Sequence, residues 1–156
     1  MSKIMQITSR SIRQLAVEYE RVIDATPEDK QTWKPFDEGR SMMDLLLECT
    51  ATNTIMAQTL NDRAMPQLDP TIYERLAAEN ETTDQKLEAF HASIENVANA
   101  MEAFPPDQLD EVVALPMRGG MEKTFAELAM MVYSHLSYHS GQINYIQTLY
   151  GDKKRH

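Results

Sequence analysis

The chain has 156 residues, 42% hydrophobic and 25% charged, which is enough to bury about two-thirds of the unfolded surface in one domain. We therefore expect residues 1–156 to form a single folded domain rather than a disordered chain. Acidic residues number 24 against 15 basic ones, and the formal net charge of −9 argues against nucleic-acid binding and against polybasic attachment to a membrane.

The cysteine content and the N-terminal segment indicate a cellular compartment. Cys49 is the one cysteine, so the chain has neither an intrachain disulfide nor a cysteine-rich zinc cluster. Charged residues such as Arg10, Arg13 and Glu18 interrupt the N-terminal segment, which therefore differs from a signal peptide. No stretch approaches the roughly 18 apolar residues of a membrane span. We expect a soluble protein of the reducing cytoplasm.

Apolar residues recur at helical spacing in four long segments, and no run alternates convincingly as a strand does. The first predicted helix spans about residues 4–25 and ends before Pro27, because the residue that precedes a proline avoids the helical region. The second predicted helix spans about residues 42–61. Ser41 and Asp44 form a capping box at its start.

The other two predicted helices lie in the second half of the chain. The third follows a capping box that begins at Thr82, and it stops before Pro105. The fourth follows a capping box that begins at Thr124 and runs to about Leu149. One further helical turn is expected in the irregular stretch before the third helix, around Tyr73–Ala78.

These four segments predict an all-α fold, a four-helix bundle. The connection between the second and third helices, about residues 62–81, is long for a compact domain. A crossover along the length of the bundle would explain it, and the two helices would then run parallel. A second irregular stretch, about residues 105–123, joins the third and fourth helices.

Two histidines of the fourth predicted helix, His135 and His139, lie four residues apart and project into one stripe. At this spacing both imidazoles can bind one metal ion. The alternative is that one is an ordinary core histidine and the other lies at the margin of the stripe. A third ligand is needed to decide between these interpretations, because two ligands do not complete a site.

Glu48 of the second predicted helix offers that third ligand. It lies toward the bundle, where a carboxylate is costly unless it is paired or binds a metal. The alternative is that Glu48 lies at the edge of the stripe and extends to water. Together with His135 and His139 it would form a two-histidine, one-carboxylate set. Such a set leaves positions open for water and substrate, and it also suits Fe(II).

Three neighbouring residues bear on this site. Gln142 follows His139 by three positions and can orient a ligand or a bound water. Gly141 lies inside the helix at a cost of about 1 kcal/mol relative to alanine, so the close approach of another helix or of a bound group would explain it. Cys49 faces the core, which favours a buried inert thiol over a thiolate ligand or nucleophile.

Two segments resemble a known family. Residues 135–146, HLSYHSGQINYI, resemble the final helix of the DinB-like (damage-inducible) four-helix-bundle family. Residues 33–35, WKP, and residues 39–46, GRSMMDLL, resemble the start of that family's second helix. The resemblance implies an up-down-down-up topology with a long crossover between helices two and three. It also implies a divalent metal at one end of the bundle, held by one histidine of helix two and two histidines of helix four.

His135 and His139 match the two ligands of helix four, whereas the helix-two position falls on Glu48. Either the carboxylate replaces the histidine, which shifts the preference toward harder ions, or the site binds metal weakly or not at all. The resemblance also implies an activity, because members of known function are metal-dependent thiol transferases and isomerases. In these a small thiol binds the metal as thiolate and attacks an electrophile.

We therefore expect Glu48, His135 and His139 to bind a divalent metal ion (zinc, nickel, manganese or iron), with Gln142 in support. The expected function is a metal-dependent hydrolase or thiol transferase, which acts on a small-molecule thiol or electrophile and forms a homodimer. The alternative is a non-catalytic structural or stress-related homodimeric bundle with a degenerate metal site. Neither a nucleic-acid partner nor a membrane partner is expected.

Overall fold

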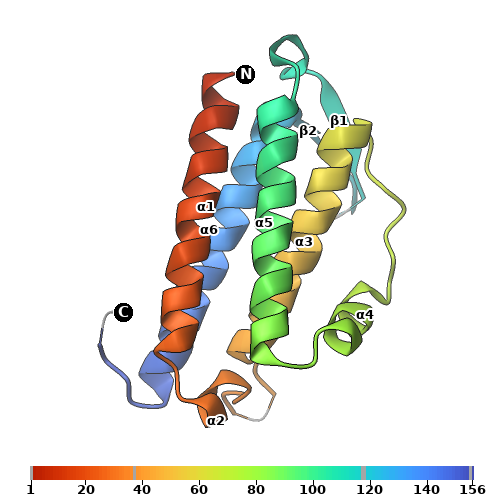
Figure 1. Cartoon of the computed structure of the whole chain (residues 1–156). Helices are drawn as coiled ribbons and strands as arrows, with labels where there is room; N and C mark the ends of the chain where they lie inside the picture. The colour runs from red at the N-terminus through yellow and green to blue at the C-terminus, as the bar shows by residue number, and fades with distance from the viewer. Residues whose placement is uncertain (1, 37, 117–118, 155) are drawn as a thin grey trace.

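The computed structural model describes residues 2–36, 38–116, 119–154 and 156. Within them, four long helices pack side by side as a bundle (Figure 1): α1 (Lys3–Asp24), α3 (Met42–Asp62), α5 (Thr83–Ala103) and α6 (Phe125–Leu149). The connections contain α2 (Glu28–Gln31), α4 (Ile72–Glu79), the 3-10 helix η1 (Pro106–Gln108), and the strands β1 (Val112–Leu115) and β2 (Met121–Thr124). The predicted four-helix bundle is confirmed, and the expected helical turn before the third long helix is α4.

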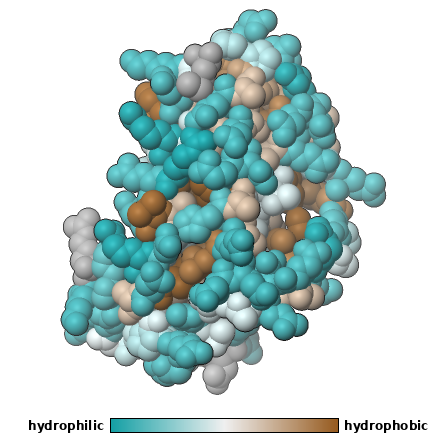
Figure 2. Space-filling model, in the orientation of Figure 1, coloured by the Kyte–Doolittle hydropathy of each residue, from teal (hydrophilic) through white to brown (hydrophobic). Residues whose placement is uncertain are grey.

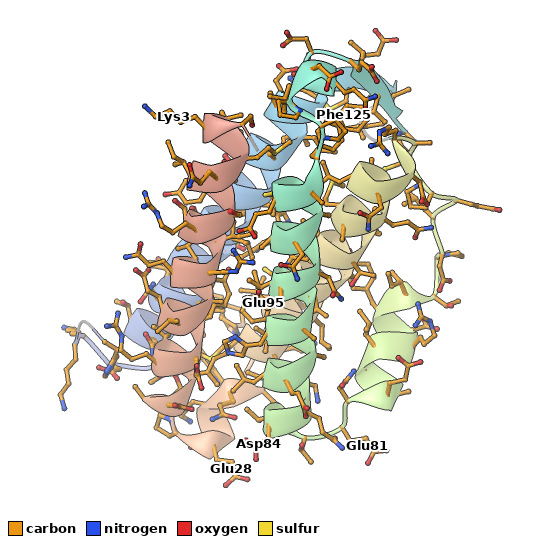
Figure 3. All side chains as sticks on the ribbon, turned by 45° about the horizontal axis from the view of Figure 1, so that its top comes forward. Lys3, Glu28, Glu81, Asp84, Glu95 and Phe125 are labelled. Carbon is orange, nitrogen blue, oxygen red and sulfur yellow. The ribbon has the colours of Figure 1, made fainter. Side chains whose placement is uncertain are left out.

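The direction of each long helix follows from the positions of its ends. Lys3 and Phe125, which begin α1 and α6, lie at one end of the bundle, whereas Glu28 and Asp84 lie at the other (Figure 3). Helices α1 and α6 therefore run one way, and α3 and α5 run the opposite way. The segment with α4 carries the chain back along the bundle, so α3 and α5 are parallel neighbours (Figure 1). The up-down-down-up topology with its long crossover is confirmed.

Apolar stripes from all four long helices form one shared core. Each helix packs mainly against two others, in the order α1, α5, α3, α6 around the bundle. The fully buried side chains include Ile12, Tyr19, Leu46, Leu60, Phe90, Met101, Leu128 and Leu136. Burial of a large apolar side chain stabilises the fold by about 1.5–3 kcal/mol, so these stripes hold the four helices together.

The face drawn in Figure 2 is covered mostly by hydrophilic residues, with smaller hydrophobic areas between them. This agrees with a chain in which a quarter of the residues are charged. Among the helices of the described residues, none combines the length and the apolar character that a membrane span requires.

The second irregular stretch differs from the prediction, because β1 and β2 pair there as an antiparallel hairpin with Leu115 opposite Met121. Val113 and Leu115 are buried, whereas the residues between and before them are exposed. Gly119 and Gly120 take positive φ angles of 81° and 93°, which suit the turn. The prediction of irregular structure was wrong here, because each strand has only four residues and β2 carries no apolar alternation.

The capping box predicted at the start of α3 is present. The Ser41 hydroxyl accepts a hydrogen bond from the Asp44 amide at 3.1 Å, and the Asp44 carboxylate accepts one from the Ser41 amide at 2.8 Å. We expect Ser41→Ala to lower the free energy of unfolding by about 1 kcal/mol, because the Asp44 amide loses its acceptor. Urea unfolding measures this change. Ser41→Thr is the control, because it keeps a hydroxyl that can accept from the Asp44 amide, and it should lose less stability than Ser41→Ala. Equal losses in the two variants would contradict the role of the hydroxyl.

Candidate metal centre

The three predicted ligands come together between α3 and α6. His139 is only 2% exposed. Its Nε2 atom lies 3.0 Å from Nε2 of His135 and 3.5 Å from Oε1 of Glu48. The same carboxylate oxygen lies 3.7 Å from Nε2 of His135. Two imidazole nitrogens and one carboxylate oxygen therefore form a small triangle.

Helix geometry places these side chains. The rings of His135 and His139 have centroids 4.4 Å apart, because side chains four residues apart share one face of a helix. Glu48 lies in the second turn of α3, which packs against α6. The packing of α3 against α6 brings this turn opposite the two histidines.

Gln142 determines how His139 presents its second nitrogen. The Nδ1 atom of His139 lies 2.6 Å from the side-chain oxygen of Gln142, and the Gln142 amide donates to the Tyr138 hydroxyl at 3.2 Å. An amide oxygen only accepts hydrogen bonds, so the His139 proton is assigned to Nδ1. The lone pair of Nε2 then points toward Glu48 and His135. Histidines that bind metal commonly have such a partner on their other nitrogen.

Both histidines are shifted toward the neutral form. Burial lowers the pKa of His135 to about 4, and the charges of His139 and Arg40 act in the same direction. Burial also lowers the pKa of His139, although the hydrogen bond to Gln142 opposes the shift and the charge of Arg40 adds to it. The two rings are therefore neutral at pH 7. Metal ions bind the neutral form of imidazole.

Arg40 contacts Glu48 and was not predicted as a site residue. Its guanidinium forms an ion pair with Oε2 of Glu48, whereas Oε1 is the oxygen that approaches the histidines. The Glu48 side chain is 24% exposed, so it lies between the two alternatives of core ligand and solvated edge residue. Arg40 precedes the N-cap of α3 and stands outside the helical periodicity, so the pattern of the helix contained no signal for this contact.

Cys49 is buried, as predicted, and it also approaches the two histidines. Its Sγ atom and one nitrogen from each of His135 and His139 all lie within 4.8 Å of one another, a spacing at which the three could hold a metal ion. Burial raises the pKa of the thiol to about 12, although the hydrogen bond with Tyr19 opposes this shift. The free thiol is therefore protonated at neutral pH and would have to lose its proton to bind a metal.

Of the two explanations predicted for Gly141, the close approach of another helix is wrong, and the approach of a bound group stays a prediction. A Cβ atom added there would meet nothing within 4 Å beyond its own helix and chain neighbours. Gly141 instead lines a cavity of about 450 Å³, here called the α6 cavity. Its lining consists of Pro35, Arg40, Leu45, Tyr138, Gly141, Gln142, Tyr145, Ile146 and Leu149. The missing side chain leaves the cavity open at this point.

A second cavity, of about 530 Å³, lies against α4 and is here called the α4 cavity. Its lining consists of Arg40, Asp44, Leu47, Glu48, Tyr73, Glu74 and Ala77. Both volumes fall in the range of about 300–1,000 Å³ that is usual for small-molecule sites. Arg40 lines both cavities, and Glu48 connects the α4 cavity to the histidines.

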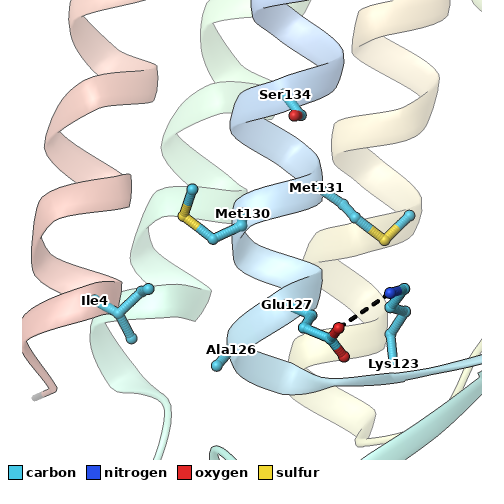
Figure 4. Close-up of a pocket in the computed structure, with 7 residues that line it drawn as sticks. All are labelled: Ile4, Lys123, Ala126, Glu127, Met130, Met131 and Ser134. Carbon is cyan, nitrogen blue, oxygen red and sulfur yellow. Dashed lines mark hydrogen bonds and ion pairs between the residues drawn. The ribbon is translucent and has the colours of Figure 1, made fainter.

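A hollow of about 360 Å³ lies near the end of the bundle where α1 and α6 begin, and its lining differs from that of the two cavities beside Arg40 (Figure 4). It is lined by Ile4, Lys123, Ala126, Glu127, Met130, Met131 and Ser134. Lys123 and Glu127 form an ion pair at 3.0 Å, which at this exposure contributes little to stability. The described residues of this lining include neither histidine nor cysteine, so the candidate metal centre lies at Glu48 instead.

The fold and the site define a four-helix-bundle protein with a cluster of side chains of the kinds that can bind a metal ion between two of its helices. Residues 12–143 match the DinB superfamily, and the chain belongs to this superfamily. Among curated proteins, none matches the sequence.

Several solved structures share the fold. A conserved protein from Enterococcus faecalis has a TM-score of 0.76 and 13% identity, with 97% of this chain and 100% of that chain covered. YfiT from Bacillus subtilis, described as a probable metal-dependent hydrolase with an unusual four-helix bundle topology, has a TM-score of 0.75 and 11% identity, with 97% and 90% covered. A mycothiol-dependent maleylpyruvate isomerase has a TM-score of 0.67 and 14% identity, with 92% of this chain and 63% of that chain covered.

Proposed function

We propose that the protein binds a divalent metal ion through His135, His139 and Glu48. The observation that carries this proposal is the triangle of ligand atoms, with sides of 3.0, 3.5 and 3.7 Å. Two ligands held about 2.0–2.1 Å from a zinc ion at a tetrahedral angle lie about 3.3 Å apart. The three atoms therefore need only small movements to bind one ion, and three protein ligands leave a position open for water or substrate.

The bound ion would supply Lewis acidity and would lower the pKa of a water or a thiol bound to it. The residues around it have separate tasks. Gln142 keeps the Nε2 lone pair of His139 directed at the site, and Arg40 holds the carboxylate of Glu48 in place through its second oxygen. The two cavities beside Arg40 provide space for a small-molecule substrate.

We propose that this centre serves a metal-dependent hydrolase or a thiol transferase, acting on a small-molecule thiol or electrophile. Membership of the DinB superfamily and the descriptions of two structural neighbours, a probable metal-dependent hydrolase and a mycothiol-dependent isomerase, support this class of activity. Imidazole and carboxylate ligands suit zinc, nickel, manganese and iron, whereas a contribution from Cys49 would favour zinc.

Metal binding is tested by thermal unfolding of protein that has been stripped with EDTA and dialysed. At 100 times its dissociation constant, Zn²⁺, Ni²⁺ or Mn²⁺ should stabilise the folded state by about 2.7 kcal/mol, because only the folded chain presents the three ligands together. This corresponds to a rise in Tm of about 5–11 °C. His91→Ala is the control, since His91 pairs with Glu20 away from the site and its loss should leave the rise unchanged. A Tm that no metal raises would contradict the proposal.

The ion pair between Arg40 and Glu48 supports a second candidate function. In a non-catalytic structural or stress-related bundle, Arg40 would satisfy the carboxylate without any metal. Metal analysis of protein purified without an affinity tag separates the two functions, because the non-catalytic bundle would contain no bound metal and would not respond to added metal. We propose a homodimer in either case, and light scattering after size-exclusion chromatography measures this.

A further inference from the structure

Arg40 occupies a position that its ion pair with Glu48 does not fully explain. Its side chain is 47% exposed and lines both cavities beside the candidate metal centre. A guanidinium presents five N–H donors, whereas the contact with Glu48 involves one carboxylate oxygen. Arg40 can therefore bind a second anionic group from the side of either cavity.

A metal ion would change the balance of charge at this point. Glu48 would then face a divalent cation through Oε1 and the guanidinium of Arg40 through Oε2. One negative charge cannot neutralise both cations, so the metal weakens the ion pair between Glu48 and Arg40. The like charges of the metal and the guanidinium also repel each other, and an anion placed beside Arg40 would relieve this repulsion.

The two cavities differ in what they would accept. Asp44, Glu48 and Glu74 give the α4 cavity three carboxylates, which repel an anion. Among the described residues that line the α6 cavity, Arg40 is the one with a formal charge. The rest of that lining is apolar or neutral and includes the rings of Tyr138 and Tyr145. An anion at Arg40 would therefore place an apolar or aromatic body in the α6 cavity.

We propose that the α6 cavity is a subsite for an organic acid, whose carboxylate binds Arg40 and whose apolar or aromatic body lies along Tyr138 and Tyr145. The subsite depends on the metal, because the guanidinium becomes available when a cation at His135, His139 and Glu48 competes for the carboxylate of Glu48. This inference rests on the proposed function and adds the chemical class of the substrate. Coupling between two sites is reciprocal, so the acid also tightens the binding of the metal.

Isothermal titration calorimetry of Zn²⁺ binding tests the coupling, with benzoate as the acid and benzamide as its uncharged counterpart. We expect saturating benzoate to tighten Zn²⁺ binding to the wild-type protein by about 5-fold or more, at the lower end of typical coupling between sites. Benzamide should have no effect. Amide chemical shifts of Gly141 and Gln142 should respond to benzoate in the zinc-loaded protein and much less in the metal-free protein.

Arg40→Gln should lose the benzoate effect, because the variant presents no cation to the acid. Arg40→Lys keeps the charge and should retain part of the effect, which also covers a failure of Arg40→Gln to fold. Lys34→Gln is the control, because Lys34 is a nearby cation that pairs with Asp44 and is not part of either cavity lining. It should keep the full benzoate effect.

The outcomes separate this inference from the proposed function. If Zn²⁺ does not bind to the wild-type protein, the proposed function and the organic-acid subsite both fail. If Zn²⁺ binds, the subsite alone is overturned by either of two results. One is a Zn²⁺ affinity that benzoate leaves unchanged; the other is a benzoate effect that survives in Arg40→Gln.

Discussion

Replacement of His139 by alanine is expected to lower the affinity for Zn²⁺ by more than about 100-fold. His139 is the most buried of the three proposed ligands, and its Nε2 atom approaches both of the others within 3.5 Å. Removal of a supporting partner such as Gln142 typically costs about 10- to 100-fold in metal affinity, and the loss of a ligand should exceed this. Isothermal titration calorimetry and metal analysis by mass spectrometry measure the change.

Three variants make this experiment specific. Gln142→Leu should bind Zn²⁺ about 10- to 100-fold more weakly than the wild type, because His139 then loses the partner that holds its Nδ1 proton. Cys49→Ser should bind Zn²⁺ nearly as well as the wild type if Glu48 is the third ligand, and Glu48→Gln should not. Zn²⁺ affinity that His139→Ala leaves intact would contradict the proposed centre. Loss in Cys49→Ser with retention in Glu48→Gln would transfer the third ligand to Cys49.

Local sequence signals were sufficient to predict the long helices. The capping boxes at Ser41 and Thr82 involve residues three positions apart, and an apolar stripe repeats within each helix. The parallel course of α3 and α5 followed from the length of a single connection together with a family resemblance. The caps and the stripes depend on short separations in the chain, so the sequence records them directly, whereas the topology needed the resemblance as well.

The remaining features depend on contacts between distant segments. Strand β2 is held by its pairing with β1 rather than by any pattern of its own. Arg40 lies just before the N-cap of α3 and pairs with Glu48 of the second turn, a contact that no helical periodicity encodes. The approach of Cys49 to the two histidines likewise depends on how α3 and α6 pack together. Helical phase placed Cys49 in the core, but phase alone could not identify its neighbours.

The aromatic contact between α1 and α5 supports the second large prediction. Phe90 is fully buried, and its ring centroid lies 5.0 Å from that of Tyr19. The Tyr19 hydroxyl donates to the backbone carbonyl of Leu136 at 2.7 Å and lies 3.5 Å from Sγ of Cys49. Phe90 therefore supports a ring that connects α1 to the parts of α3 and α6 beside the candidate metal centre.

We expect Phe90→Ala to lower the free energy of unfolding by about 3–5 kcal/mol, because it removes buried apolar surface and leaves a cavity beside Tyr19. A domain of this size has a total stability of about 5–15 kcal/mol, so the metal-free variant should unfold about 6–20 °C below the wild type. Phe36→Ala is the control, since the Phe36 side chain is 90% exposed and its loss should change stability by less than about 0.5 kcal/mol. Urea unfolding of both variants measures the difference. A loss below about 1 kcal/mol in Phe90→Ala would mean that the core closes over the missing ring, and Tyr19 would then not depend on Phe90 for its position.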